Sequence, residues 1–142
     1  MIIPDANLLL YAYDEASPFH ARVKPWWSAC LSGAEPVGLV PVVLFAFVRL
    51  GTSPRVFEHP FTVAEATTHV EAWLEVETVE LLATVRADVD QALAWLAAAG
   101  SGGSLTTDAQ IAAVARRCRA VVHTADTDFA RFPGVRWLNP LL

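Results

Sequence analysis

Charged side chains are scarce in this sequence. They make up 18% of its 142 residues, whereas the apolar set reaches 54%, and globular domains average about 25% charged residues. Either the core is unusually complete, or apolar surface is left for a partner. Long apolar runs are nevertheless missing: the longest, Val37 to Val48, is too short to cross a bilayer and contains Pro41. Asp5 interrupts the first apolar residues, which excludes a signal peptide. We expect one cytoplasmic domain over residues 1–142, with no membrane contact.

Cysteine is also rare, and several catalytic motifs are absent. Cys30 and Cys118 stand alone in apolar surroundings, which fits neither a zinc site nor a disulfide framework, so we expect buried thiols. The chain has no Gly-rich phosphate-binding loop, no dinucleotide-binding fingerprint and no Gly-x-Ser-x-Gly elbow. These absences exclude the commonest nucleotide-binding and serine-hydrolase chemistries.

Positive charge is limited as well. The net charge is −5, from 15 acidic and 10 basic residues, although proteins that bind nucleic acid usually lean basic. Carboxylates that hold metal ions remove this objection, because bound cations invert the local charge. Nine of the ten basic residues are arginine, which suits bidentate phosphate contact. Arg116, Arg117 and Arg119 fit the negative end of a helix dipole, and an RNA-binding patch is the alternative.

Short apolar strands alternate with amphipathic helices along the whole chain. This alternation predicts an α/β fold, with a parallel sheet of about five short strands between layers of helices. Gly100 to Ser104 is interpreted as a helix stop, not as a domain boundary. The expected strands are 1–3, 37–40, 76–82, 121–124 and 134–138, and the expected helices are 6–13, 19–31, 42–50, 62–75, 88–99 and 107–117.

Two adjacent tryptophans lie in the second expected helix. Trp26 and Trp27 cannot both face one apolar stripe. One of them is a candidate for a partner surface, and core packing is the alternative for either.

Three aspartates occupy related places in this pattern. Asp5 follows the first strand, Asp126 follows the fourth, and Asp108 opens the helix that leads into the fourth. Each alone can cap a helix or complement its dipole. Strand ends beside a topological switch point line one crevice, however. Three carboxylates there repel one another unless a cation lies among them, and their hard oxygens suit Mg²⁺ or Mn²⁺. The pattern therefore predicts metal-assisted hydrolysis of phosphodiesters.

Several ordered segments strengthen this interpretation. Residues 3–12 and 106–113 resemble the first and third motifs of PIN-domain nucleases, and residues 123–132, with the closing 137–140, resemble the fourth motif in VapC toxins. Residues 48–57 are similar to a stretch of the mycobacterial-type VapC group. Together these segments span essentially the whole chain.

The resemblance implies a three-layer α/β/α PIN-like fold and a Mg²⁺-dependent endoribonuclease, with Mn²⁺ as a substitute. It also implies the toxin half of a type II toxin–antitoxin pair: a homodimer that a VapB-type antitoxin inhibits. Structured RNA such as tRNA or rRNA is the implied substrate. The residues that match the family's site are the metal ligands Asp5, Asp108 and Asp126, the additional acid or supporting residue Asp128, and the hydrogen-bonding residues Asn7 and Thr124.

One position departs from the family pattern. Many PIN domains carry a glutamate on the helix after the second strand, followed directly by phenylalanine and then, two residues on, by arginine. This chain has Ala46 there, before Phe47 and Arg49. The missing acid leaves an alternative function open: a catalytically weak PIN-like module that binds RNA or protein.

Overall fold

The computed structural model describes residues 1–142 and contains one parallel sheet. Its strand order is β3-β2-β1-β4-β5, and every neighbouring pair is parallel. The chain therefore builds outward from β1 to one edge and then returns to add β4 on the other side. This places the topological switch point between β1 and β4. The strands are β1 (Ile2–Pro4), β2 (Val37–Leu39), β3 (Val79–Leu81), β4 (Val121–His123) and β5 (Arg136–Leu138).

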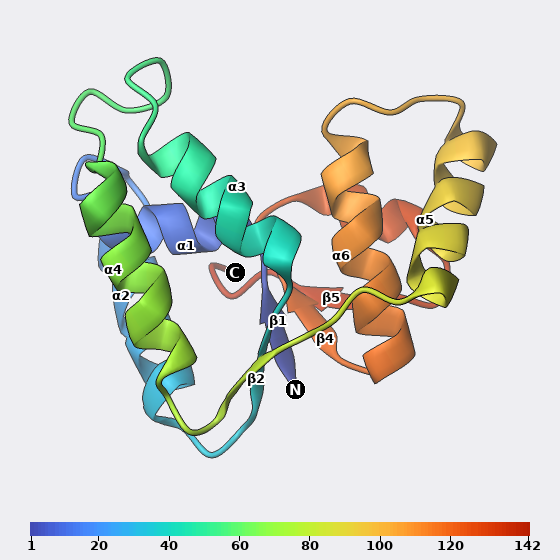
Figure 1. Ribbon diagram of the computed structural model, residues 1–142, viewed down its shortest axis with the longest axis horizontal. Helices are drawn as coiled ribbons and strands as arrows, with labels where there is room; N and C mark the ends of the chain where they lie inside the picture. The colour runs from blue at the N-terminus through green and yellow to red at the C-terminus, as the bar shows by residue number, and fades with distance from the viewer.

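Helices cover both sides of this sheet. Figure 1 shows α5 and α6 on one side and α1 to α4 on the other, which gives the predicted three-layer α/β/α arrangement. The helices are α1 (Ala6–Tyr13), α2 (His20–Ser32), α3 (Pro41–Gly51), α4 (Val63–Leu74), α5 (Arg86–Ala99) and α6 (Leu105–Cys118), and a 3₁₀ helix, η1 (Thr127–Arg131), follows β4. None of these helices is both long and apolar enough to span a membrane.

The core forms where the central strands meet α1, α3 and α6. All residues of β1 and β2 are buried, whereas the edge strands β3 and β5 are largely exposed, as expected when helices cover both faces of the inner strands. The buried face of α6 consists mainly of small residues, including Ala109, Ala112 and Ala113. These short side chains allow α6 to lie close to the sheet.

Some element boundaries differ from the sequence prediction. Helix α6 begins at Leu105, two residues before the predicted start at residue 107. Helix α5 begins at Arg86 because the carboxylate of Asp88 turns back and accepts a hydrogen bond from the backbone N–H of Val85, at 2.9 Å. The third strand is shorter than expected, since only Val79–Leu81 pairs with β2.

The two adjacent tryptophans both make aromatic contacts within the chain. Trp27 is buried, and its ring meets Trp73 edge-on. Trp26 stacks on His123 of β4 and donates its indole N–H to that ring's Nδ1, at 3.3 Å. Core packing is therefore the correct alternative for Trp27, and Trp26 is half-buried against the sheet. Both cysteines are free; Cys30 is buried, as predicted, whereas Cys118 is only partly buried.

Candidate metal centre

The site begins where β1 and β4 end. Pro4 and His123 are partners in the parallel register, and the N–H of Asp5 donates to the carbonyl of His123, at 2.9 Å. The next residue of β4's chain, Thr124, is fully buried. Its hydroxyl donates to Oδ2 of Asp5, at 2.8 Å, and accepts from the N–H of Asp126, at 2.9 Å. One hydroxyl thus joins the two strand ends and fixes the positions of both acids.

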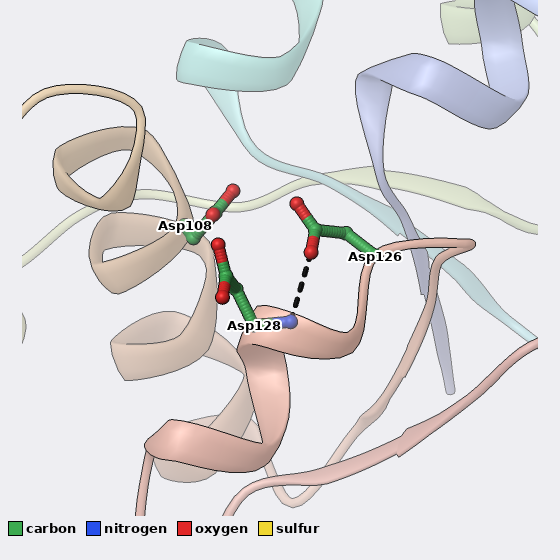
Figure 2. Close-up of side chains that lie close together, drawn as sticks. All are labelled: Asp108, Asp126 and Asp128. Atoms are coloured by element: carbon green, nitrogen blue, oxygen red, sulfur yellow. Dashed lines mark hydrogen bonds between the residues drawn. The ribbon is translucent and has the colours of Figure 1, made fainter.

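Asp126 is both a helix cap and part of an acidic cluster. Its Oδ1 accepts a hydrogen bond from the N–H of Asp128, at 2.8 Å, at the start of η1. Figure 2 shows that the carboxylates of Asp108, Asp126 and Asp128 point toward one another, with Asp108 reaching across from α6. Each of the three offers an oxygen within 4.8 Å of the other two. Capping and clustering are therefore compatible for Asp126.

Asp108 has the least satisfied carboxylate of the cluster. It lies in the first turn of α6, is only 7% exposed, and its Oδ2 is buried without a hydrogen-bond partner. Burial, together with the smaller effects of the neighbouring charges of Asp5, Asp126 and Asp128, raises the pKa of Asp108 to about 7. A buried polar atom without a partner is costly in a native protein. A bound cation would supply the missing partner and remove the repulsion.

Asp5 stands beside this cluster. It occupies the N-cap position of α1, as predicted, but its side chain makes no capping hydrogen bond to that helix. Burial raises the pKa of Asp5, and the hydrogen bond from the Thr124 hydroxyl partly opposes this rise. The three carboxylates that lie within 4.8 Å of one another include Asp128 and not Asp5. Ligation by Asp5, Asp108 and Asp126 remains a prediction.

The remaining two positions lie on helices that border the site. Asn7, in the first turn of α1, is half-buried, and its side chain makes no hydrogen bond. Ala46 of α3 is buried and lines a recess together with Thr107 of α6. Residue 46 therefore faces the N-terminal end of α6, next to Asp108. No carboxylate projects from α3.

The donor set fits a hard divalent cation. All four acids offer carboxylate oxygens, the ligands that Mg²⁺ and Mn²⁺ prefer. The only basic side chain in an ion pair with any of them is Arg131, whose Nη1 lies 3.9 Å from Asp128. The cluster's negative charge is thus not balanced from within the chain. In chemical terms, the site can hold a cation next to a phosphodiester at the open end of the sheet.

This fold and acidic site define a known class. The PIN domain family model matches residues 2–135, and the chain therefore belongs to the PIN-domain family. Within it, the chain is a VapC-type ribonuclease. It is 43% identical over 141 residues to ribonuclease VapC33 of Mycobacterium tuberculosis, and the match covers 99% of each chain.

Solved structures agree on the fold. The crystal structure of Mycobacterium tuberculosis VapC20, described as a toxin that cleaves the sarcin–ricin loop, superposes with a TM-score of 0.71 at 22% identity, covering 96% of this chain and 99% of that one. VapBC2 from Rickettsia felis, bound to a DNA fragment of its promoter, gives a TM-score of 0.68 at 16% identity and covers 98% of both chains. The predicted family and the predicted three-layer fold are both confirmed.

Proposed function

We propose that this VapC-type ribonuclease is a Mg²⁺-dependent endoribonuclease that hydrolyses phosphodiester bonds in structured RNA, tRNA or rRNA, with Mn²⁺ as a possible substitute. The observation that carries this proposal is the buried, unpartnered Oδ2 of Asp108 among carboxylates. Asp5, Asp108 and Asp126 would hold the cation, with Asp128 as a fourth acid. Asn7 and Thr124 would support them by hydrogen bonds.

The chain's own contribution is to hold these acids in place before any substrate arrives. Thr124 fixes Asp5 through its hydroxyl and fixes the backbone of Asp126, so two ligands from different strand ends share one anchor. A bound divalent cation would supply Lewis acidity for an attacking water and for the scissile phosphate. Asp128 is half-exposed, and its carboxylate can accept the proton that this water releases.

The proposed setting is a cytoplasmic toxin, a single domain over residues 1–142, that a VapB-type antitoxin inhibits. Solved VapBC complexes share its fold, which supports such a partner. A mostly apolar groove of about 310 Å³ between α3 and α4 is lined in part by Leu44, Val48 and Val70. A groove of this kind suits the apolar face of an amphipathic segment.

The proposed assembly is a homodimer. Val85, just before α5, forms an exposed apolar row with Val89 and Leu93 of that helix. Such a row is unfavourable in a monomer and suits burial against a second copy. Sedimentation of the purified chain should give a dimer at micromolar concentration. Leu93→Asp should shift it to monomer, and a parent that sediments as a monomer throughout would contradict this part of the proposal.

The central experiment compares RNA cleavage by the parent chain and by Asp126→Asn. Asparagine keeps an acceptor for the N–H of Asp128, so helix capping and melting temperature should change little, while cleavage of total RNA should fall by orders of magnitude. Asp90→Asn, a change at an exposed acid of α5, is the matched control. Equal cleavage by Asp126→Asn and parent would refute the proposal.

A second candidate function rests on Ala46. A site without a carboxylate from α3 holds a cation less tightly, which would favour a weakly catalytic module that binds RNA or protein. The same assay separates the two functions. The module predicts RNA binding without new 5′ ends, and binding that is unaffected by Asp126→Asn.

A further inference from the structure

Helix α3 and the first turn of α6 border an open recess of about 420 Å³. Its six lining residues are Val42, Phe45, Ala46, Val48, Arg49 and Thr107. Thr107 directly precedes Asp108, so one side of the recess belongs to the turn of α6 that carries this acid of the proposed metal centre. We call this recess the α3–α6 recess.

The wall of this recess carries an aromatic ring, Phe45, which also borders the apolar groove between α3 and α4 that is proposed for the antitoxin. Phe45 is 73% exposed, and no other aromatic side chain of the protein is as exposed. It belongs to none of the aromatic pairs in the core, whereas Phe47, two residues later, contacts Tyr13, Phe61 and Trp73. A ring exposed in this way costs solvation free energy in the free protein. Its position therefore points to a ligand.

The same helix face carries an unpaired cation. Arg49 lies one turn after Phe45, is exposed, and makes neither an ion pair nor a side-chain hydrogen bond. Arg117 and Arg131, by contrast, pair with acids of this chain. In a chain with a net charge of −5, a free guanidinium next to a cation-binding cluster selects an anionic ligand that also has a flat apolar face.

We infer that the α3–α6 recess binds a nucleotide of the RNA strand next to the scissile phosphate, with its base stacked on Phe45 and its phosphate paired with Arg49. The inference rests on the proposed ribonuclease function and extends it with a substrate subsite. Unpaired bases bind proteins mainly by stacking on aromatic or Arg side chains, and arginine suits phosphate because its donors form a planar fork. Ala46 keeps the recess open, because a longer side chain would fill its inner end.

The test asks whether RNA binding needs an aromatic ring at position 45 or only an apolar side chain. Single-turnover cleavage of a synthetic stem–loop RNA with unpaired loop bases is measured over a range of protein concentrations, which yields the half-saturating concentration and the maximal rate. Phe45→Leu should raise the half-saturating concentration about tenfold with little change in maximal rate, and Phe45→Tyr should match the parent. Phe19→Leu is the matched control, because Phe19 is also exposed but packs on Tyr11.

Abasic substitutions locate the base. Removing one base at a time from the RNA should weaken binding to the parent at one position near the cut. In Phe45→Leu, removal of the same base should cause no further loss, because the free-energy effects of changing two groups in contact are not additive. Arg49→Gln should weaken binding at every sequence and reduce its salt dependence, while Arg22→Gln, at an exposed and unpaired arginine of α2, should not.

Several outcomes would overturn the inference. Equal effects of Phe45→Leu and Phe45→Tyr, or cleavage insensitive to both, would show that no base stacks there. A change from dimer to monomer in Phe45→Leu, seen by sedimentation, would assign the ring to a protein interface instead. A parent that neither binds nor cuts RNA would refute the proposed function itself, so the two failures are distinguishable.

Discussion

Asp88 and Asp108 are both buried, and both lie in the first turn of a helix, α5 and α6 respectively. Asp88 is only 2% exposed, yet both oxygens of its carboxylate accept hydrogen bonds. It accepts from the N–H of Val85 at 2.9 Å and from Nε of Arg117 at 2.9 and 3.1 Å. Asp108 has no cationic partner and faces three other carboxylates. Two aspartates with similar burial thus have different roles. Asp88 stabilises the packing of α5 on α6, and Asp108 is available to the proposed cation.

This contrast shows how a site is distinguished from a structural ion pair. Buried charges are retained when they are paired and hydrogen-bonded, as Asp88 is. An unpaired buried carboxylate destabilises the free protein, because its ionised form is disfavoured in the folded state. The arrangement around Asp108 is therefore one that the proposed cation would stabilise.

Exchanging the two aspartates for asparagine gives the largest expected effects. Asp108→Asn should reduce RNA cleavage by orders of magnitude, and Asp88→Asn should leave the activity per folded molecule unchanged. Stability should respond in the opposite sense. Asp88→Asn weakens the contact with Arg117 and should lower the free energy of unfolding by about 2 kcal/mol. Asp108→Asn removes a repelled charge and should not lower it at pH 8.

Cleavage of total RNA and chemical denaturation in the absence of divalent cations check these expectations. Loss of activity in Asp88→Asn at full folding, or destabilisation by Asp108→Asn comparable to that by Asp88→Asn, would remove the distinction between the two carboxylates.

Thr124 links the acidic cluster to the sheet, and its removal should have the next largest effect. Thr124→Val keeps the side chain's shape but removes the donor to Asp5 and the acceptor for the N–H of Asp126. Such supporting contacts are worth about 10–100-fold in metal affinity. Mn²⁺ titration by calorimetry should show this loss, and Thr68→Val, which removes an exposed hydroxyl on α4, should not. Unchanged Mn²⁺ affinity in Thr124→Val would show that its hydroxyl does not position the ligands.

The raised pKa of Asp108 makes metal binding depend on pH. Because its pKa is about 7 in the metal-free protein, a cation must displace a proton below that pH. Mn²⁺ affinity should therefore rise about tenfold per pH unit up to about pH 7 and level off above it. Stability without metal follows the reverse course. The folded-state pKa exceeds the unfolded value of 3.8, so this group's contribution is greatest below that value and is lost as the pH rises toward 7.

Calorimetry and denaturation between about pH 5 and pH 8 test both trends, and Asp108→Asn should abolish the pH dependence that arises from this group. A Mn²⁺ affinity that stays constant over that range would place the titrating proton elsewhere.

The comparison of Asp88 with Asp108 also marks the limit of sequence reasoning. Strand and helix periodicity predicted the layers, and strand-end position brought Asp108 and Asp126 to one edge. Arg117 was assigned to a helix dipole, because its true partner lies 29 residues away and only the packing of α5 on α6 brings them together. The family resemblance identified Asp128 as an additional acid, but its place among the three carboxylates within 4.8 Å of one another depends on the turn that Asp126 makes by capping η1.

The smallest predicted effect concerns Ala46. Its position beside Thr107 means that a glutamate there would extend toward Asp108. Ala46→Glu should therefore tighten Mn²⁺ binding to the RNA-free protein by several-fold, because another hard anionic ligand joins a site that now lacks one from α3. The same change in an Asp5→Asn background should help much less, since the two acids would share the ion.

Ala46→Gln is the matched control for that change, because it has the same length without the charge. It should leave metal affinity at the parent level. Both variants extend into the α3–α6 recess, so both should weaken binding of the stem–loop RNA, even though only the glutamate improves binding of the ion. If Ala46→Glu tightens Mn²⁺ binding and weakens RNA binding, residue 46 lies between the metal ion and the RNA. If Ala46→Glu leaves Mn²⁺ affinity unchanged, α3 contributes nothing to the metal centre, and the three carboxylates of Figure 2, with Asp5 beside them, must hold the cation by themselves.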